Sequence, residues 1–187
     1  MQFKEIEYKY DAADVTMVQF VELMETQSIK KKMMVSSYDD YFVDSVGNFI
    51  RYRHHDGRGE LTIKRKLNVN NNNERLEVNV PTIGDNLKTI TAFVDLLGYK
   101  PNFGIYKTCK IYWIDKVVLV YYVVYDKDLK ELRRFVEVEA DEDLSWETEQ
   151  QAWDEIAKYE KLLEPLGITP KNRLKKSLFE IFRKVPT

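Results

Sequence analysis

The stretch KEIEYKY, residues 4–10, decides the fold prediction because charged and apolar residues alternate along it. On a β-strand, successive side chains point to opposite faces. Glu5, Glu7 and Lys9 therefore share one face, and the apolar side chains between them share the other. The sequence predicts a strand with one strongly charged face and one apolar face.

The same division into charged and apolar faces recurs along the chain. Four further strand-like stretches carry two charged residues at alternate positions: Arg51 and Arg53, Lys64 and Lys66, Arg75 and Glu77, and Glu137 and Glu139. One arrangement that fits is an antiparallel sheet with its charged face in water, which is common for half-buried sheets. The alternative is a closed barrel whose charged faces point inward.

Two features of the charges favour the barrel. They come in pairs at alternate positions, and acids gather on some strands while bases gather on others. A lumen lined by both signs needs a highly charged ligand, because charges removed from water require partners. A triphosphate with divalent cations meets this need. Lys and Arg bind phosphate oxygens, and carboxylates bind Mg²⁺ or Mn²⁺.

The remaining pattern predicts a single α+β domain covering residues 1–187. We expect strands at residues 3–10, 39–44, 48–53, 60–66, 75–80, 104–114, 116–125 and 132–140, and helices at 14–30, 84–98, 143–167 and 170–185. The polar stretch 68–73 is expected to be a loop. The stretch 54–59 is expected to be a hairpin loop that exposes His54 and His55.

Capping residues mark where the predicted helices begin and end. Asp14, Asp85 and Ser145 are candidate N-caps. Gly98 and Gly167 follow two of the helices, where glycine readily adopts the left-handed conformation that ends a helix. Trp113, Trp146 and Trp153 are expected to be packing residues.

Composition narrows the class of protein. The chain has 187 residues and a formal net charge of −2, which argues against binding a DNA duplex through bulk positive charge. Cys109 is the single cysteine, so neither an intrachain disulfide nor a thiolate zinc cluster is expected. The longest apolar run, residues 117–125, is too short to span a bilayer, and the first residues lack a signal-peptide pattern. We therefore expect a cytoplasmic protein without a membrane partner.

Several short motifs occur in an order that resembles a known family. They are EIEYK at 5–9, FIRYR at 49–53, LTIK at 61–64, RLEVN at 75–79, LLGYKP at 96–101, YKTCKIYW at 106–113, FVEVE at 135–139, LLEPLGI at 162–168 and KKSLFE at 175–180. The first resembles the ExExK signature of the CYTH superfamily, the triphosphate tunnel metalloenzymes, and the others resemble its later elements in family order. The resemblance covers nearly the whole chain.

The resemblance implies an eight-stranded antiparallel β-barrel, with helices packed on its outside and a triphosphate bound in its tunnel. The implied metal ligands, for Mg²⁺ or Mn²⁺, are Glu5, Glu7, Glu77, Glu137 and Glu139. The implied phosphate ligands are Lys9, Arg51, Arg53, Lys64, Lys66, Arg75, Lys107, Lys110 and Lys176. Among these, Glu5, Glu7 and Lys9 form the implied catalytic group. A homodimer is compatible with the family.

Two of the departures from the family pattern affect the implied site. Asn79 stands where the family often has a second Glu, and Cys109 stands where it has an Arg. A shift of strand register would bring Lys110 to the position of Cys109. A small strand residue is the expected role of Cys109, because no His is placed by pattern to activate a nucleophile.

The activity expected from the resemblance is metal-dependent hydrolysis of inorganic triphosphate, ATP or another nucleoside triphosphate, or thiamine triphosphate. The first alternative is a class IV adenylyl cyclase, which forms cyclic AMP and pyrophosphate from ATP. The second is a non-catalytic nucleotide or polyphosphate binder, which the departures at Asn79 and Cys109 keep open. An interaction domain is the expectation if the charged faces point outward.

Overall fold

The computed structural model describes residues 3–55, 57–68, 71–83, 86–141 and 146–184. Side chains are described throughout these ranges except at residues 3–5, 64–68, 71–76 and 83. No helix in the described part of the chain is long and apolar enough to cross a membrane.

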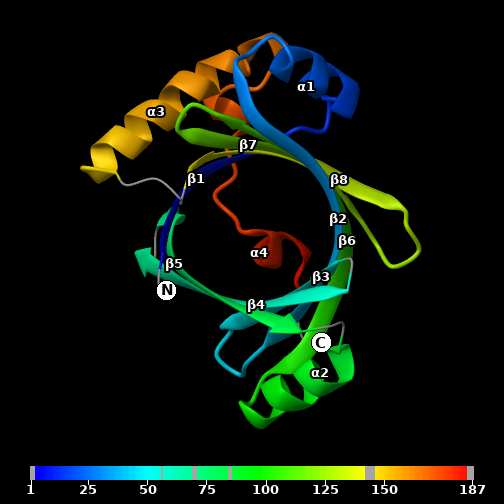
Figure 1. Ribbon diagram of the computed structural model, residues 1–187. Helices are drawn as coiled ribbons and strands as arrows, with labels where there is room; N and C mark the ends of the chain where they lie inside the picture. The colour runs from blue at the N-terminus through cyan, green and yellow to red at the C-terminus, as the bar shows by residue number, and fades with distance from the viewer. Residues whose placement is uncertain (1–2, 56, 69–70, 84–85, 142–145, 185–187) are drawn as a thin grey trace.

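The described residues form a closed barrel of eight antiparallel strands, as the sequence predicts (Figure 1). The strands are β1 (Phe3–Asp11), β2 (Ile29–Val43), β3 (Phe49–His55), β4 (Arg58–Asn68), β5 (Asn71–Ile83), β6 (Lys100–Ile114), β7 (Val117–Tyr125) and β8 (Glu131–Ala140). Their order around the barrel is β1-β5-β4-β3-β2-β6-β7-β8. Strand β1 closes the ring, because residues 3–6 pair with β5 and residues 7–11 pair with β8.

The helices lie around and inside this ring. They are α1 (Met17–Met24), α2 (Leu87–Leu96), α3 (Glu149–Leu162) and α4 (Leu178–Phe182), with the 3₁₀ turns η1 (Glu164–Leu166) and η2 (Pro170–Asn172) between the last two. In Figure 1, α1 and α3 cover one side of the ring, α2 lies on the opposite side, and α4 lies within its outline.

Three clusters of buried apolar side chains border the described part of the barrel, and one of them joins β2 and β3 to α2. The outer cluster joins the barrel to α1 and α3 and includes Tyr10, Phe20 and Ile156. The inner cluster joins Phe135 of β8 to Phe179 of α4. Because its barrel residues come from one half of each strand, α4 fills one end of the barrel interior.

The helix predicted at residues 14–30 is shorter in the structure. It starts after Thr16 because Thr16 and Gln19 form a reciprocal capping box, so Asp14 is not the cap. It ends at Met24, and the chain from Ile29 onward pairs with β6, because tertiary strand pairing outweighs local helical spacing. Strand β2 therefore starts ten residues earlier than the predicted strand at residue 39.

Other boundaries also differ from the predictions. His54 and His55 lie in β3 and are half-buried, because the strand extends to the tight turn at Gly57. The expected loop at 68–73 is largely strand, with β4 reaching Asn68 and β5 beginning at Asn71. The helix predicted at 170–185 is reduced to η2 and α4.

Two of the predicted helix ends are confirmed, whereas two predicted N-caps lie outside the described residues. Gly98 and Gly167 have φ of +87° and +75°, the left-handed conformation that ends a helix. Asp85 and Ser145, the two predicted N-caps, lie outside the described residues. The described caps of α2 and α3 are Asn86 and Thr148.

Candidate functional site

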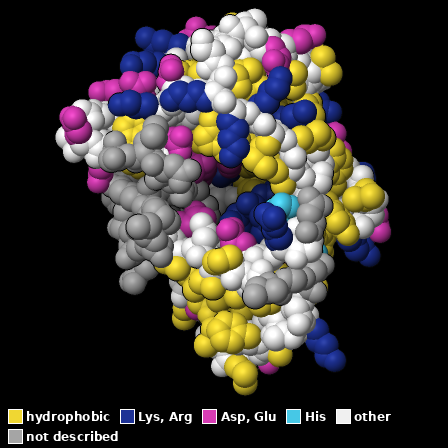
Figure 2. Space-filling model, viewed as in Figure 1, with side chains coloured by type: hydrophobic (Ala, Val, Ile, Leu, Met, Phe, Trp, Pro, Cys, Tyr) yellow, Lys and Arg dark blue, Asp and Glu magenta, His cyan; other side chains and the backbone are white. Residues whose placement is uncertain are grey.

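The barrel holds a cavity of about 380 Å³ that is lined by charged and apolar side chains in similar measure. Figure 2 shows this hollow on one face of the molecule, with basic and acidic side chains inside it. The charged residues that line it are Glu7, Lys9, Arg51, Arg53, Glu60, Glu77, Lys107, Glu137, Glu139 and Asp141. The described charged faces therefore point inward, and the arrangement with these faces in water is wrong.

A buried carboxylate organises the basic side of the cavity. Asp39 of β2 is fully buried, lies between β3 and β6, and accepts two hydrogen bonds from Arg53, at 2.8 and 3.0 Å. Its second oxygen also lies 2.8 Å from Lys107 Nζ. One acid thus fixes two bases that reach into the cavity.

Electrostatics explain why this group is ionised. Burial alone would raise the pKa of Asp39, but the charges of Arg53 and Lys107 outweigh burial and hold that pKa far below its usual range. Burial lowers the pKa of Lys107, and the charge of Arg53 lowers it further, against the opposite effect of Asp39. Lys107 therefore loses its proton at a lower pH than an exposed lysine does.

Arg51 belongs to a second polar group on neighbouring strands. Its Nη2 donates to the Thr62 hydroxyl at 2.8 Å, and that hydroxyl lies 2.8 Å from the side-chain carbonyl of Asn79. Arg51 Nε is a buried donor with no hydrogen-bond partner among the described residues. A buried donor left in this state costs free energy, and the oxygen of a bound anion would satisfy it.

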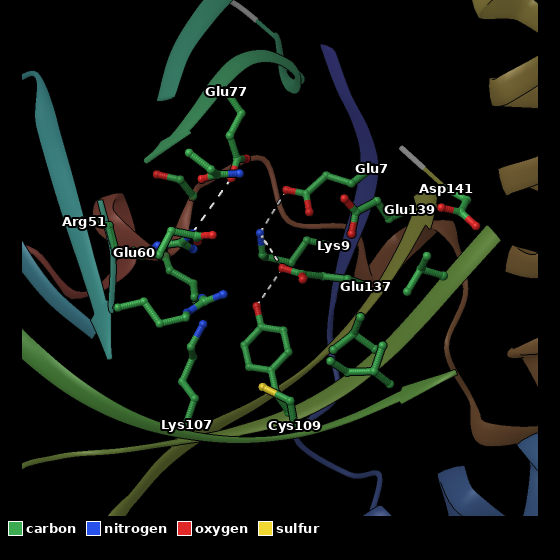
Figure 3. A pocket seen from close by; sticks show the side chains of 18 of the residues that line it. Glu7, Lys9, Arg51, Glu60, Glu77, Lys107, Cys109, Glu137, Glu139 and Asp141 are labelled. Atoms are coloured by element: carbon green, nitrogen blue, oxygen red, sulfur yellow. Dashed lines mark hydrogen bonds and ion pairs between the residues drawn. The ribbon is translucent and has the colours of Figure 1, made fainter. Parts of the chain in front are cut away.

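The acidic side of the cavity is formed by β1 and β8 (Figure 3). Lys9 Nζ lies between Glu7 and Glu137, 3.1 and 2.8 Å from their oxygens. Tyr122 donates a hydrogen bond to Glu137 at 2.8 Å. Glu139 is the cross-strand partner of Glu7. Figure 3 shows these acids on the side away from Lys107.

The chemistry of the acidic side suits a hard divalent cation, because its donors are carboxylate oxygens. In the described part of the chain, however, no three His, Cys, Asp or Glu side chains are grouped as a metal site. Lys9 instead bridges Glu7 and Glu137 and balances their charge. The donor atoms of the acidic side are therefore of the type that binds Mg²⁺ or Mn²⁺, although Lys9 lies between two of these carboxylates.

Eight of the predicted site residues meet in the cavity: Glu7, Lys9, Arg51, Arg53, Glu77, Lys107, Glu137 and Glu139. The side chains of Glu5, Lys64, Lys66 and Arg75 lie outside the described residues. Their backbones pair in register, with Glu5 opposite Arg75 and Lys64 opposite Glu77.

Two predicted residues are not brought to the cavity. Lys110 follows Cys109, which lines the cavity, so the alternation of a strand places Lys110 on the outer face. No register shift interrupts β6 at this point, and the proposed substitution of Lys110 for Cys109 is wrong. Lys176 is exposed and precedes Ser177, the residue with which the chain enters the cavity.

The sequence prediction missed Asp39, Glu60, Tyr122 and Asp141. Counting back from the turn at residues 44–48 would have placed Asp39 opposite Arg53, so the signal was present. Tyr122 lies in the apolar run 117–125, which has no alternation to mark its inner face. Its neighbour Tyr121 points outward and donates to the Val15 carbonyl.

Comparisons with known proteins identify the fold. No protein-family model matches the chain, and no curated protein sequence matches it. A protein of Pyrococcus furiosus has a similar solved structure, with a TM-score of 0.75, 23% identity, and coverage of 95% of this chain and 99% of that chain.

Two further structures, from Vibrio parahaemolyticus and Bacillus halodurans, are each described as a "putative adenylate cyclase". Both have a TM-score of 0.65, with 13% and 14% identity respectively. The comparison covers 96% and 97% of this chain, and 97% and 98% of those chains. At these identities the likeness shows a common fold.

Proposed function

We propose that the chain binds a triphosphate in the barrel cavity and hydrolyses it with a divalent cation. The observation that carries this proposal is the division of one barrel cavity into a basic side, with Arg51, Arg53 and Lys107, and an acidic side, with Glu7, Glu137 and Glu139. A cavity with both signs suits a ligand that brings polyanion and cation together.

The basic side would bind the phosphates. Guanidinium groups donate to phosphate oxygens; Arg53 is held by Asp39 through Nε and Nη2, so its contact to a phosphate would come from Nη1. Arg51 offers its buried Nε, and Lys107 adds a compact charge. These three side chains come from β3 and β6, so the rigid barrel fixes their spacing.

The acidic side would hold the cation through Glu7, Glu137 and Glu139, with Glu77 nearby on β5. A cation bound there would neutralise phosphate charge and activate a water molecule for attack at the terminal phosphorus. Lys9 balances the acids in the structure, and in the complex its ammonium would be within reach of a phosphate. Tyr122 would orient Glu137 by its hydrogen bond.

Incubation with inorganic triphosphate or ATP, in Mg²⁺ and then Mn²⁺, tests the proposal, with products separated by ion exchange. We expect phosphate release, which is lost in Glu7→Gln/Glu139→Gln and in Arg53→Gln. Lys110→Gln is the matched control, because this lysine lies on the outer face of the strand that carries Lys107. No turnover and no binding of either compound would refute the proposal.

Adenylyl cyclase activity is a second candidate, favoured by the fold shared with two structures described as "putative adenylate cyclase". The same incubation separates the two reactions, because a cyclase forms cyclic AMP and pyrophosphate from ATP. Cyclic AMP in the product would replace hydrolysis as the function. Tight binding without turnover would identify a triphosphate binder.

A further inference from the structure

One row of side chains crosses three strands of the cavity wall and is joined by hydrogen bonds. Arg51 of β3 is the cross-strand partner of Thr62 of β4, and Thr62 is the partner of Asn79 of β5. Arg51 and Asn79 line the cavity, and Thr62 between them is fully buried. Figure 3 shows Arg51 across the cavity from Glu7 and Glu139. We refer to Arg51, Thr62 and Asn79 as the β3–β5 row.

The direction of each hydrogen bond in the row follows from the chemistry of its members. A guanidinium can only donate, so the Thr62 oxygen accepts from Arg51 Nη2 at 2.8 Å. The one hydroxyl proton of Thr62 must then go to an acceptor. Asn79 Oδ1 lies 2.8 Å from the hydroxyl oxygen, whereas Glu60 Oε1 lies 3.3 Å from it. The hydroxyl therefore donates to Asn79, and the amide oxygen of Asn79 is turned toward Thr62.

The amide nitrogen of Asn79 is thereby left for the cavity. This nitrogen carries two N–H donors. Among the described residues, the only hydrogen bond of the Asn79 side chain is the one that it accepts from Thr62. Because Asn79 is half-buried and lines the cavity, its two donors can reach a ligand there.

Two acids lie beside the row without holding Arg51. Oxygens of Glu60 and Glu77 are 3.6 and 3.9 Å from Arg51 Nη2. Both distances are longer than a hydrogen bond. The Arg51 guanidinium is therefore not held by an acid in the way that Asp39 holds Arg53. The row offers the cavity one positive group and one neutral donor.

From this row we infer that Asn79 donates a hydrogen bond to an oxygen of the bound triphosphate, and that Arg51 and Asn79 bind phosphate without a cation. The inference rests on the proposed function and adds a ligand residue on β5 to it. A carboxylate at position 79 would offer the cavity an acceptor in place of a donor, and it would need a cation between itself and a phosphate. The amide of Asn79 therefore sets which part of the ligand this position of β5 contacts, namely the anion.

The test measures anion binding without a divalent cation, so that metal bound at the acidic side does not contribute. Inorganic triphosphate is titrated by calorimetry, in EDTA, into the wild type and into Asn79→Asp. The variant keeps an oxygen for the Thr62 hydroxyl and nearly the same shape, but it turns an acceptor toward the cavity where the donor was. We expect its affinity for triphosphate to fall about 10- to 100-fold.

Asn86→Asp is the matched control, because it adds the same charge at the N-cap of α2, outside the barrel. Aspartate caps a helix about as well as asparagine does, and residue 86 is exposed. The affinity of this control for triphosphate should stay within about twofold of the wild type, because charges in water are screened. An equal loss in Asn86→Asp and Asn79→Asp would overturn the inference, because net charge would then explain both.

A measurement on the wild type decides even if Asn79→Asp does not fold. The side-chain amide signals of Asn79 are followed by heteronuclear NMR during the same titration. We expect one of the two amide protons to move downfield and to exchange more slowly with water when triphosphate binds. Signals of Asn79 that stay unchanged at saturating triphosphate overturn the inference.

The remaining outcomes separate the inference from the proposed function. Wild-type affinity in a folded Asn79→Asp overturns the inference and leaves the proposed function intact. So does a wild type that binds triphosphate in Mg²⁺ but not in EDTA, because the β3–β5 row would then require a cation. No binding of triphosphate to the wild type in either condition refutes the proposed function, and the inference with it.

Discussion

Asp39 on β2 and Arg53 on β3 are cross-strand partners, and the carboxylate accepts two hydrogen bonds from the guanidinium. The pair is largely removed from water, since Asp39 is fully buried. Because the same carboxylate also holds Lys107, one acid neutralises part of the positive charge of the cavity before any ligand enters. Asp39 thereby reduces the repulsion between Arg53 and Lys107 in the empty barrel, and the three side chains together still carry a net positive charge that would attract an anion.

Asp39→Asn should therefore destabilise the protein and make its stability depend on anions. Loss of the carboxylate leaves Arg53 and Lys107 without their shared partner, which we expect to cost about 3–5 kcal/mol. Inorganic triphosphate should restore more stability to the variant than to the wild type, because it replaces the missing negative charge. Urea unfolding with and without inorganic triphosphate measures both effects.

The matched control is Asp128→Asn, the same change in an exposed turn, which should alter stability by less than about 0.5 kcal/mol. A wild-type-like unfolding curve for Asp39→Asn would contradict the role given to this acid. So would an equal gain from triphosphate in both proteins.

Lys107 should make anion binding sensitive to alkaline pH. Burial lowers its pKa below the ordinary value of 10.5, so its positive charge is present below that lowered pKa and is lost as the pH rises through it. Affinity for inorganic triphosphate should therefore decline at a pH lower than expected for an exposed lysine. Titrations between pH 7 and 10.5 measure the decline.

In Lys107→Arg the guanidinium stays charged over this range, so the decline should shrink or disappear. Tyr122 does not contribute, because burial, and then the charge of Glu137, raise its pKa well above its ordinary value. An identical pH profile in the wild type and in Lys107→Arg would show that another group causes the decline.

Tyr122→Phe should weaken cation binding at the acidic side. The variant removes the hydroxyl that donates to Glu137 at 2.8 Å, and the loss of such an orienting bond typically weakens metal affinity about 10- to 100-fold. Mn²⁺ titration followed by electron paramagnetic resonance measures the affinity directly. Tyr121→Phe is the matched control, because its hydroxyl donates to the Val15 carbonyl on the outer side. Equal Mn²⁺ affinity in the two variants would contradict the assignment.

Much of the barrel could be predicted from the sequence because alternation carries the information. A strand with paired charges at alternate positions, such as Glu137 and Glu139, shows the two-residue repeat of a β-strand, and the charges mark which of its two faces is polar. The lengths and boundaries of the strands were less predictable. The first half of β2 carries Lys30, Lys31 and Lys32 in succession, which have no strand pattern, and it is strand because β6 pairs with it.

The charged residues of the site could be predicted from the sequence. The residues whose place in the site depends on strand register could not. Arg53 and Lys107 could be named from their type and spacing, whereas Asp39, which holds them, could be found only through the strand register across the turn at residues 44–48. Likewise, alternation alone places Lys110 outside, yet only the regular pairing of β6 around residue 110 excludes a register shift there. Trp113 also lines the cavity, but Ile111, the preceding residue on the same face of β6, is apolar and does not mark that face.

Phe179→Ala tests whether α4 holds one end of the barrel interior. The Phe179 ring is buried and stacks on Phe49 of β3 with ring centroids 4.4 Å apart. Its removal leaves a void that the rigid barrel cannot collapse to fill, so we expect a loss of about 3–5 kcal/mol in the free energy of unfolding. Phe93→Ala on α2 is the control, because that side chain is 51% exposed and should cost far less. If both variants lose the same small amount in urea unfolding, α4 is only loosely attached and does not close the barrel.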